Sequence, residues 1–223
     1  EIFSLRTPDI KKLFLTFVMA LLCNVVSFAQ FAGGNGTEGN PYLISTKAQF
    51  EAIANQQNYA SGKYFKQTAD INLGVYENRA SSIIPTFRGT YDGDGKTITY
   101  QASFNGTSNK GNYALFGLVE GGTLEKINVN ADVTISGTAN NMQVALLCGK
   151  FTPNKQTETS SGSKPVTYSY TYSSSGIIIN CNVNGNINST VSASEGGGTD
   201  AGLLVGESQG QIKYCNGNGN VRG

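Results

Sequence analysis

Two carboxylates one residue apart, Asp92 and Asp94, are the candidates for metal ligands in this sequence. They lie in the run Asp92-Gly93-Asp94-Gly95, and alternate carboxylates also begin a calcium-binding loop. No Glu follows at the distance that an EF-hand requires for its bidentate ligand. The two Asp-Gly steps supply the positive φ of a tight turn, so we favour a turn between two strands within 87–98. We therefore expect no cofactor and keep the two carboxylates as metal candidates only.

The cysteines offer a second kind of chemistry. Cys181 and Cys215 occupy matching positions in two copies of one phrase, and Cys148 lies upstream. Cysteines in neighbouring repeats would be close enough for a disulfide. Both also fall in the apolar register of their phrases, where small buried side chains are expected. We favour packing over a disulfide and assign neither cysteine a catalytic role.

Catalytic residues of the usual kinds are scarce. The 223 residues include no His, the commonest general base, and no Trp. A polysaccharide-cleaving β-helix needs clustered carboxylates on one strand face. The carboxylates after residue 100 do not repeat in register; they are Asp132, Asp200, Glu120, Glu125, Glu158, Glu195 and Glu207. The sequence therefore predicts that this chain is not an enzyme, with a polysaccharide lyase or hydrolase as the alternative.

Three tyrosines form the candidate binding site. Tyr168, Tyr170 and Tyr172 alternate with Ser and Thr in a polar insertion at 151–175, which places three phenols on one strand face. Insertions on a rigid repeat scaffold often carry the binding surface. The rings would contact a glycan or a protein, or they would pack onto the scaffold and hold the insertion in place. The sequence leaves these alternatives open.

The N-terminus has the pattern of an export signal. Lys11 and Lys12 precede an apolar run at 13–26, and Ser27-Phe28-Ala29 provides the small residues of a cleavage site. The alternative, a transmembrane anchor, would need about 20 apolar residues. We expect cleavage after Ala29, with no membrane insertion afterwards, and a secreted, outer-membrane or cell-surface location.

Charge and length set the remaining limits. The formal net charge is +1 with no basic run, so nucleic acid is not an expected partner. We expect a signal peptide at 1–29, the start and cap of a solenoid at 30–75, and β-helix repeats at 76–223. Because the chain starts without Met and stops inside a repeat, we expect it to be cut from a longer protein. The oligomeric state is left open.

The elements that position these residues are repeats. Residues 176–187 read GIIINCNVNGNI, residues 210–221 read GQIKYCNGNGNV, and a divergent copy at 122–133 reads GTLEKINVNADV. Self-similarity at a fixed period indicates stacked units that share one core. A second phrase accompanies the first at 114–117, 144–149 and 201–206.

Within the phrase, apolar side chains at 177, 179, 181, 183 and 187 alternate with Asn. Period-two alternation predicts half-buried strands, here at 177–181, 183–191 and 201–206. Three strands in 34 residues without a helix predict one turn of a right-handed parallel β-helix. Asn186 is then expected beside Asn220, in a ladder of amides.

A short helix is expected near the N-terminus. Thr46 and Gln49 form a capping box, and Phe50, Ile53 and Ala54 make an apolar stripe that continues up to Gln57. Because an exposed parallel edge invites aggregation, we expect this helix to cover the open end of the solenoid.

The phrase at 201–206, followed by Gly210-Gln211-Ile212, Cys215 and Gly219-Asn220-Val221, resembles the GLUG repeat. Gly217 departs from the family pattern. The stretches 33–44, 62–73 and 87–98 also resemble parts of such proteins. The resemblance implies a secreted or surface β-helix of the Bacteroidetes type, found in adhesin-like proteins and beside surface peptidases, without agreed catalytic residues. We expect an adhesin-like module that binds glycans or host or matrix proteins, or a purely structural spacer.

Overall fold

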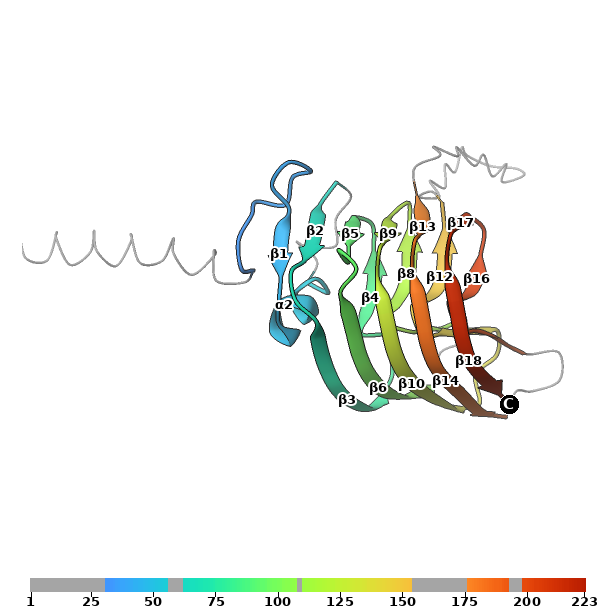
Figure 1. Ribbon diagram of the computed structural model, residues 1–223. Helices are drawn as coiled ribbons and strands as arrows, with labels where there is room; N and C mark the ends of the chain where they lie inside the picture. Colours follow the sequence, from blue (N-terminus) through green and yellow to red (C-terminus); the bar gives the residue numbers. More distant parts are fainter. Residues whose placement is uncertain (1–30, 56–61, 108–109, 154–175, 193–197) are drawn as a thin grey trace, which may run out of the picture.

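The computed structural model describes residues 31–55, 62–107, 110–153, 176–192 and 198–223. These residues form successive coils stacked along one axis, and their strands make four parallel β-sheets that run along it. One short helix lies at the N-terminal end (Figure 1). Each complete coil of the described chain contributes one strand to each sheet, and the coils at the two ends contribute fewer. The arrangement is a parallel β-helix, as predicted, and the right hand is the one that parallel crossovers prefer.

Sheet I consists of six short strands in the order of the chain. They are β1 (Tyr42–Ile44), β2 (Tyr64–Gln67), β5 (Thr90–Asp92), β9 (Thr123–Glu125), β13 (Ile177–Ile179) and β17 (Gln211–Lys213). Sheet II holds the longest strands, which lie side by side in Figure 1. They are β3 (Ile71–Arg79), β6 (Thr97–Gly106), β10 (Asn128–Gly137), β14 (Asn182–Val191) and β18 (Asn216–Arg222).

Sheets III and IV close the coil. Sheet III contains β7 (Asn112–Tyr113), β11 (Met142–Ala145) and β15 (Thr199–Gly202). Sheet IV contains β4 (Ile84–Phe87), β8 (Phe116–Glu120), β12 (Cys148–Thr152) and β16 (Val205–Ser208). The strand predicted at 201–206 is therefore two strands, because the chain bends at Leu203 and Leu204 and passes from sheet III to sheet IV.

A left-handed residue forms the corner between sheets I and II in three coils. Lys126, Asn180 and Tyr214 have φ of 52°, 54° and 53°. This corner changes which alternate residues face inward. Ile178 is fully buried, whereas Ile177 and Ile179 are partly exposed, so the predicted inward positions 177 and 179 were wrong. After the corner, Cys181, Val183 and Ile187 are buried as predicted.

The interior of the coils is filled with aromatic and aliphatic side chains. Phe87 packs on Phe65 and Phe116 with ring centroids 5.9 and 5.3 Å apart. The helix α2 (Lys47–Ala52) adds Phe50 to this core, edge-on to Tyr91 and Phe116 at 5.8 Å each.

The helix begins at the predicted capping box. The Thr46 hydroxyl accepts from the Gln49 backbone N–H at 3.3 Å, and Gln49 Oε1 accepts from the Thr46 N–H at 3.2 Å. The helix ends at Ala52, earlier than the predicted stripe. Since Phe50 is fully buried against the coils, α2 acts as the expected cap.

Candidate functional site

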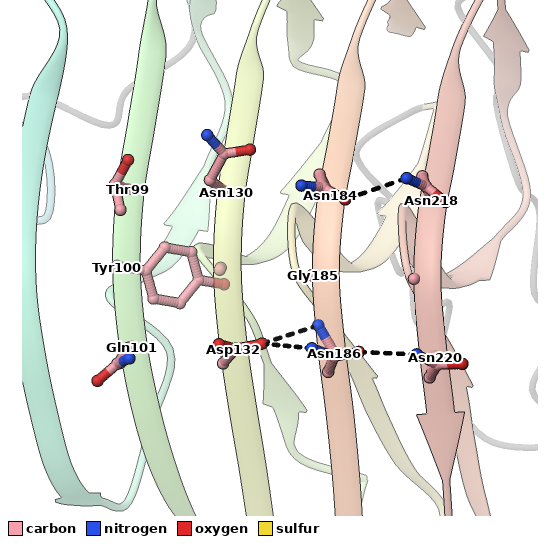
Figure 2. A pocket seen from close by; sticks show the side chains of 12 residues that line it. Thr99, Tyr100, Gln101, Asn130, Asp132, Asn184, Gly185, Asn186, Asn218 and Asn220 are labelled. Atoms are coloured by element: carbon pink, nitrogen blue, oxygen red, sulfur yellow. Dashed lines mark hydrogen bonds between the residues drawn. The ribbon is translucent and has the colours of Figure 1, made fainter.

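A groove crosses the outer face of sheet II, with a volume of about 490 Å³. Two rows of polar side chains form its walls, and both run along the coil axis (Figure 2). Row A consists of Thr99, Asn130, Asn184 and Asn218, and row B consists of Gln101, Asp132, Asn186 and Asn220. The floor is formed by Tyr100, Ala131, Gly185 and Gly219.

The register of sheet II builds these rows. The strands β6, β10, β14 and β18 pair parallel without a shift at this point, so each residue lies beside its counterpart one coil away. Since side chains alternate between faces, positions two apart on one strand both point outward. The polar residues that alternate with apolar residues in the repeat therefore form the two walls of the groove.

Row B is ordered by a chain of hydrogen bonds that ends on a carboxylate. Nδ2 of Asn220 donates to Oδ1 of Asn186 at 3.1 Å, and Nδ2 of Asn186 donates to Oδ1 of Asp132 at 2.9 Å. The backbone N–H of Asn186 donates to the same oxygen at 3.1 Å. Figure 2 shows these bonds running across the three strands. The carboxylate thus fixes the direction in which the amides of Asn186 and Asn220 point.

Row A has a looser network. Nδ2 of Asn218 donates to Oδ1 of Asn184 at 3.3 Å. Asn130 makes no side-chain hydrogen bond to any other described residue. Asn130 and Asn184 are both exposed to solvent. This wall therefore presents amide donors and acceptors to the solvent.

The floor differs from coil to coil. Tyr100 is buried, and its hydroxyl crosses the interior to donate to the carbonyl oxygen of Leu146 at 2.6 Å. Burial raises the pKa of Tyr100 well above its usual value. Gly185 and Gly219 have φ of 145° and 149°, a region that L side chains rarely adopt. A glycine inside a strand often marks a close approach of another backbone or a ligand.

The groove is nearly neutral and strongly hydrogen-bonding. Among its twelve lining residues, Asp132 is the only carboxylate and none carries a positive charge. Six lining side chains are primary amides, each with two N–H donors and a carbonyl acceptor. Such walls suit an uncharged ligand rich in hydroxyl or amide groups.

A second hollow of about 470 Å³ continues from the groove toward the N-terminal cap. It shares Gln101 and Asp132 with the groove and adds Val75, which is 60% exposed, and Tyr76. The Tyr76 hydroxyl donates to Oε1 of Glu51 on α2 at 2.7 Å. The cap and the polar face of sheet II are therefore linked through Tyr76.

The predicted binding tyrosines, Tyr168, Tyr170 and Tyr172, lie outside the described residues. The described chain leaves sheet IV at Pro153 and re-enters sheet I at Gly176. The tyrosine row stays a prediction. The signal peptide at 1–29 also lies outside the described residues.

The candidate metal ligands are engaged in ion pairs. Asp92 lies 3.6 Å from Nζ of Lys126, and Asp94 lies 3.2 Å from Nζ of Lys66. Asp92 also accepts from the backbone N–H of Asp94 at 2.9 Å, which closes the turn. No group of three His, Cys, Asp or Glu residues with the arrangement of a metal site occurs in the described part of the chain.

The two repeat cysteines are neighbours, and both are free thiols. The Cys181 backbone N–H donates to Sγ of Cys215 at 3.4 Å. Hydrogen bonding from Cys181 lowers the pKa of Cys215 to about 6. In return, the bond to Cys215 and burial raise the pKa of Cys181. Burial also raises the pKa of Cys148.

The sequence interpretation missed half of the groove. It predicted that Asn186 would lie beside Asn220, which the structure confirms. It did not place Thr99, Gln101, Asn130 or Asp132 in the same walls. Asp132 and Asn186 are 54 positions apart, not 34, because an insertion separates their coils. Aligning the divergent phrase at 122–133 with the later copies would have matched Asp132 to Asn186.

Comparison with known proteins gives few matches. No protein-family model matches the chain. A protein of Evansella cellulosilytica named "Putative Gly-rich membrane protein" is 30% identical over 146 residues, and the match covers 55% of this chain. The chain spans only 16% of that relative's length. No helix in the described ranges is long and apolar enough to cross a membrane.

Among solved structures, the chain is similar to "a putative immunoglobulin A1 protease" from Bacteroides ovatus. The identity is 17% and the TM-score 0.47, over 83% of this chain and 59% of the other. The prediction that this chain is not an enzyme is wrong on this comparison, because the neighbour is named as a protease. At this identity and TM-score no residue's role is transferred to this chain.

Proposed function

We propose that this chain is a surface-associated β-helix module of an adhesin-like protein, and that it binds a neutral glycan in the groove of sheet II. The observation that carries the proposal is the pair of polar rows that line the groove on the outer face of sheet II. Sugar hydroxyls both donate and accept hydrogen bonds, and so do the amides of rows A and B. A rigid sheet holds these groups in place before the ligand arrives, which lowers the entropy lost on binding.

The charge of the groove favours a neutral ligand. Asp132 would repel uronates, sulfates and phosphates, and no lining residue would neutralise them. A protein ligand usually needs a buried apolar anchor at the centre of its interface. The groove walls are polar throughout, so a glycan is the better match.

The surface location rests on three observations. The leader pattern at 1–29 is typical of exported proteins. The relative in Evansella is named as a membrane protein, and the repeats resemble the GLUG repeats of surface proteins. Membership of the GLUG family and an adhesin-like role are part of this proposal.

Binding to insoluble polysaccharides tests the proposed function. The chain is incubated with cellulose, chitin, xylan and mannan, and the bound fraction is measured for wild type and for Asn186→Leu. Leu has the same branching as Asn but cannot hydrogen-bond, so we expect retention on at least one polymer to fall.

The matched control is Asn182→Leu. Asn182 donates to Oδ1 of Asn128 at 3.0 Å in a ladder of the same kind, but outside the groove. This variant should bind like wild type. Retention on none of the polymers, or equal loss in both variants, would contradict the proposal.

Tyr168, Tyr170 and Tyr172 provide a second test of glycan binding. A triple Tyr→Ala variant is compared with wild type on a glycan array. A loss of signal would extend the binding surface to the insertion, whereas equal signals would remove the tyrosine row from the proposal.

A further inference from the structure

The groove can bind amide groups of a ligand as well as hydroxyl groups, because the amides of its walls already hydrogen-bond to one another. Resting on the proposed function, we propose that its ligand is a polysaccharide of β-1,4-linked N-acetylhexosamine, lying along the coil axis. The acetamido groups of such a chain would join the amide ladders of rows A and B.

The ladders show how an acetamido group would be held. Amide bonds from Asn218 to Asn184 and from Asn220 to Asn186 measure 3.3 and 3.1 Å, each from Nδ2 to Oδ1. Each of these amides keeps a second N–H, and Asn130 keeps its whole amide group. An acetamido group has one N–H and one carbonyl, so it can donate to one rung and accept from the next.

The spacing of the rows also fits this ligand. Successive coils lie about 4.8 Å apart, which is close to the length of one pyranose residue. In a β-1,4-linked chain, successive sugars are turned over, so their acetamido groups point alternately to opposite sides. Rows A and B flank the groove on opposite sides, so alternate acetamido groups would meet alternate rows.

Asp132 has a positioning role in this scheme. Its carboxylate accepts from both the backbone and the side chain of Asn186, which sets the direction of the row B amides. Because both bonds end on Oδ1, we assign Asp132 to orienting the amides of Asn186 and Asn220. The ligand should therefore be recognised through its acetamido groups and not through charge.

Calorimetric titration with three matched hexamers tests the inference. The probes are β-1,4-linked hexamers of N-acetylglucosamine, of glucose and of glucosamine, which differ only at the second carbon of each sugar. We expect the N-acetylglucosamine hexamer to bind at least about tenfold more tightly than the glucose hexamer, an effect of one to two amide hydrogen bonds.

The variants locate the effect. Asn186→Leu should weaken binding of the N-acetylglucosamine hexamer by about tenfold, whereas Asn182→Leu should leave it unchanged. Circular dichroism checks that both variants keep the β fold.

Three outcomes would overturn the inference. Equal affinity for the glucose hexamer would remove the acetamido preference while leaving glycan binding intact. Tightest binding of glucosamine would show charge attraction to Asp132 instead. If none of the three hexamers bound, the inference would be overturned. Glycan binding itself would be overturned only if the chain were also not retained on the insoluble polymers.

Discussion

At the scale of single residues, glycine and asparagine have different roles in the groove of sheet II. Asn186 and Asn220 form the wall, and Gly185 and Gly219 form the floor beside them. The unusual φ of Gly185 accompanies an N–H of Asn186 that donates to the side chain of Asp132. The Asn-Gly-Asn phrase thus encodes both the shape and the polarity of the groove.

Replacing Gly185 by Ala should destabilise the fold. A Cβ at this position would overlap the carbonyl oxygen of Ala131, and the φ of 145° is strained for any L side chain. We expect a loss of at least about 2 kcal/mol in the free energy of unfolding, measured by urea titration. Gly39→Ala is the control, because a Cβ there meets nothing within 4 Å. Equal midpoints for the two variants would contradict the account of the floor.

The cysteines should differ in reactivity. Because its pKa is lowered by the hydrogen bonds from Cys181, Cys215 should hold more thiolate at neutral pH than an ordinary cysteine, and its alkylation should slow as the pH falls. Raised pKa values keep Cys148 and Cys181 as unreactive thiols at the same pH. Mass spectrometry after brief iodoacetamide treatment should find the label on Cys215 first. Faster labelling of Cys181 would show that the hydrogen bond between the two is wrongly assigned.

At the scale of elements, the coil is a sequence of short strands separated by defined corners. The left-handed residues Lys126, Asn180 and Tyr214 turn the chain from sheet I into sheet II. Three different side chains occupy this corner, so no residue type marks it in the sequence. Period-two alternation therefore predicted the strands of sheet II well, but it extended the inward register through the corner to Ile177 and Ile179, where it failed.

The cap offers a prediction at this scale. Phe50 is fully buried and contacts the rings of Tyr91 and Phe116. Phe50→Ala should therefore cost about 3–5 kcal/mol in the free energy of unfolding. Thr46→Ala removes only the capping hydrogen bond and should cost about 1 kcal/mol. If urea unfolding gave equal losses for the two variants, α2 would not anchor the end of the coils.

At the scale of the whole molecule, the β-helix separates an apolar interior from a polar outer face, and both run the length of the stack. The repeat phrase was sufficient to predict the stacking and the Asn ladder. It was not sufficient to predict the groove, because Thr99 and Gln101 come from a coil that lacks the phrase and Asp132 comes from its divergent copy. Only the parallel register brings these residues beside Asn186.

The central claim is that rows A and B hold a glycan. The most direct measurement is nuclear magnetic resonance of the isotope-labelled chain, which follows the side-chain amide signals during titration with the N-acetylglucosamine hexamer. The account predicts that the signals of Asn184, Asn186, Asn218 and Asn220 shift together, while that of Asn182 stays in place. Binding of the hexamer without any shift of these four signals would contradict it.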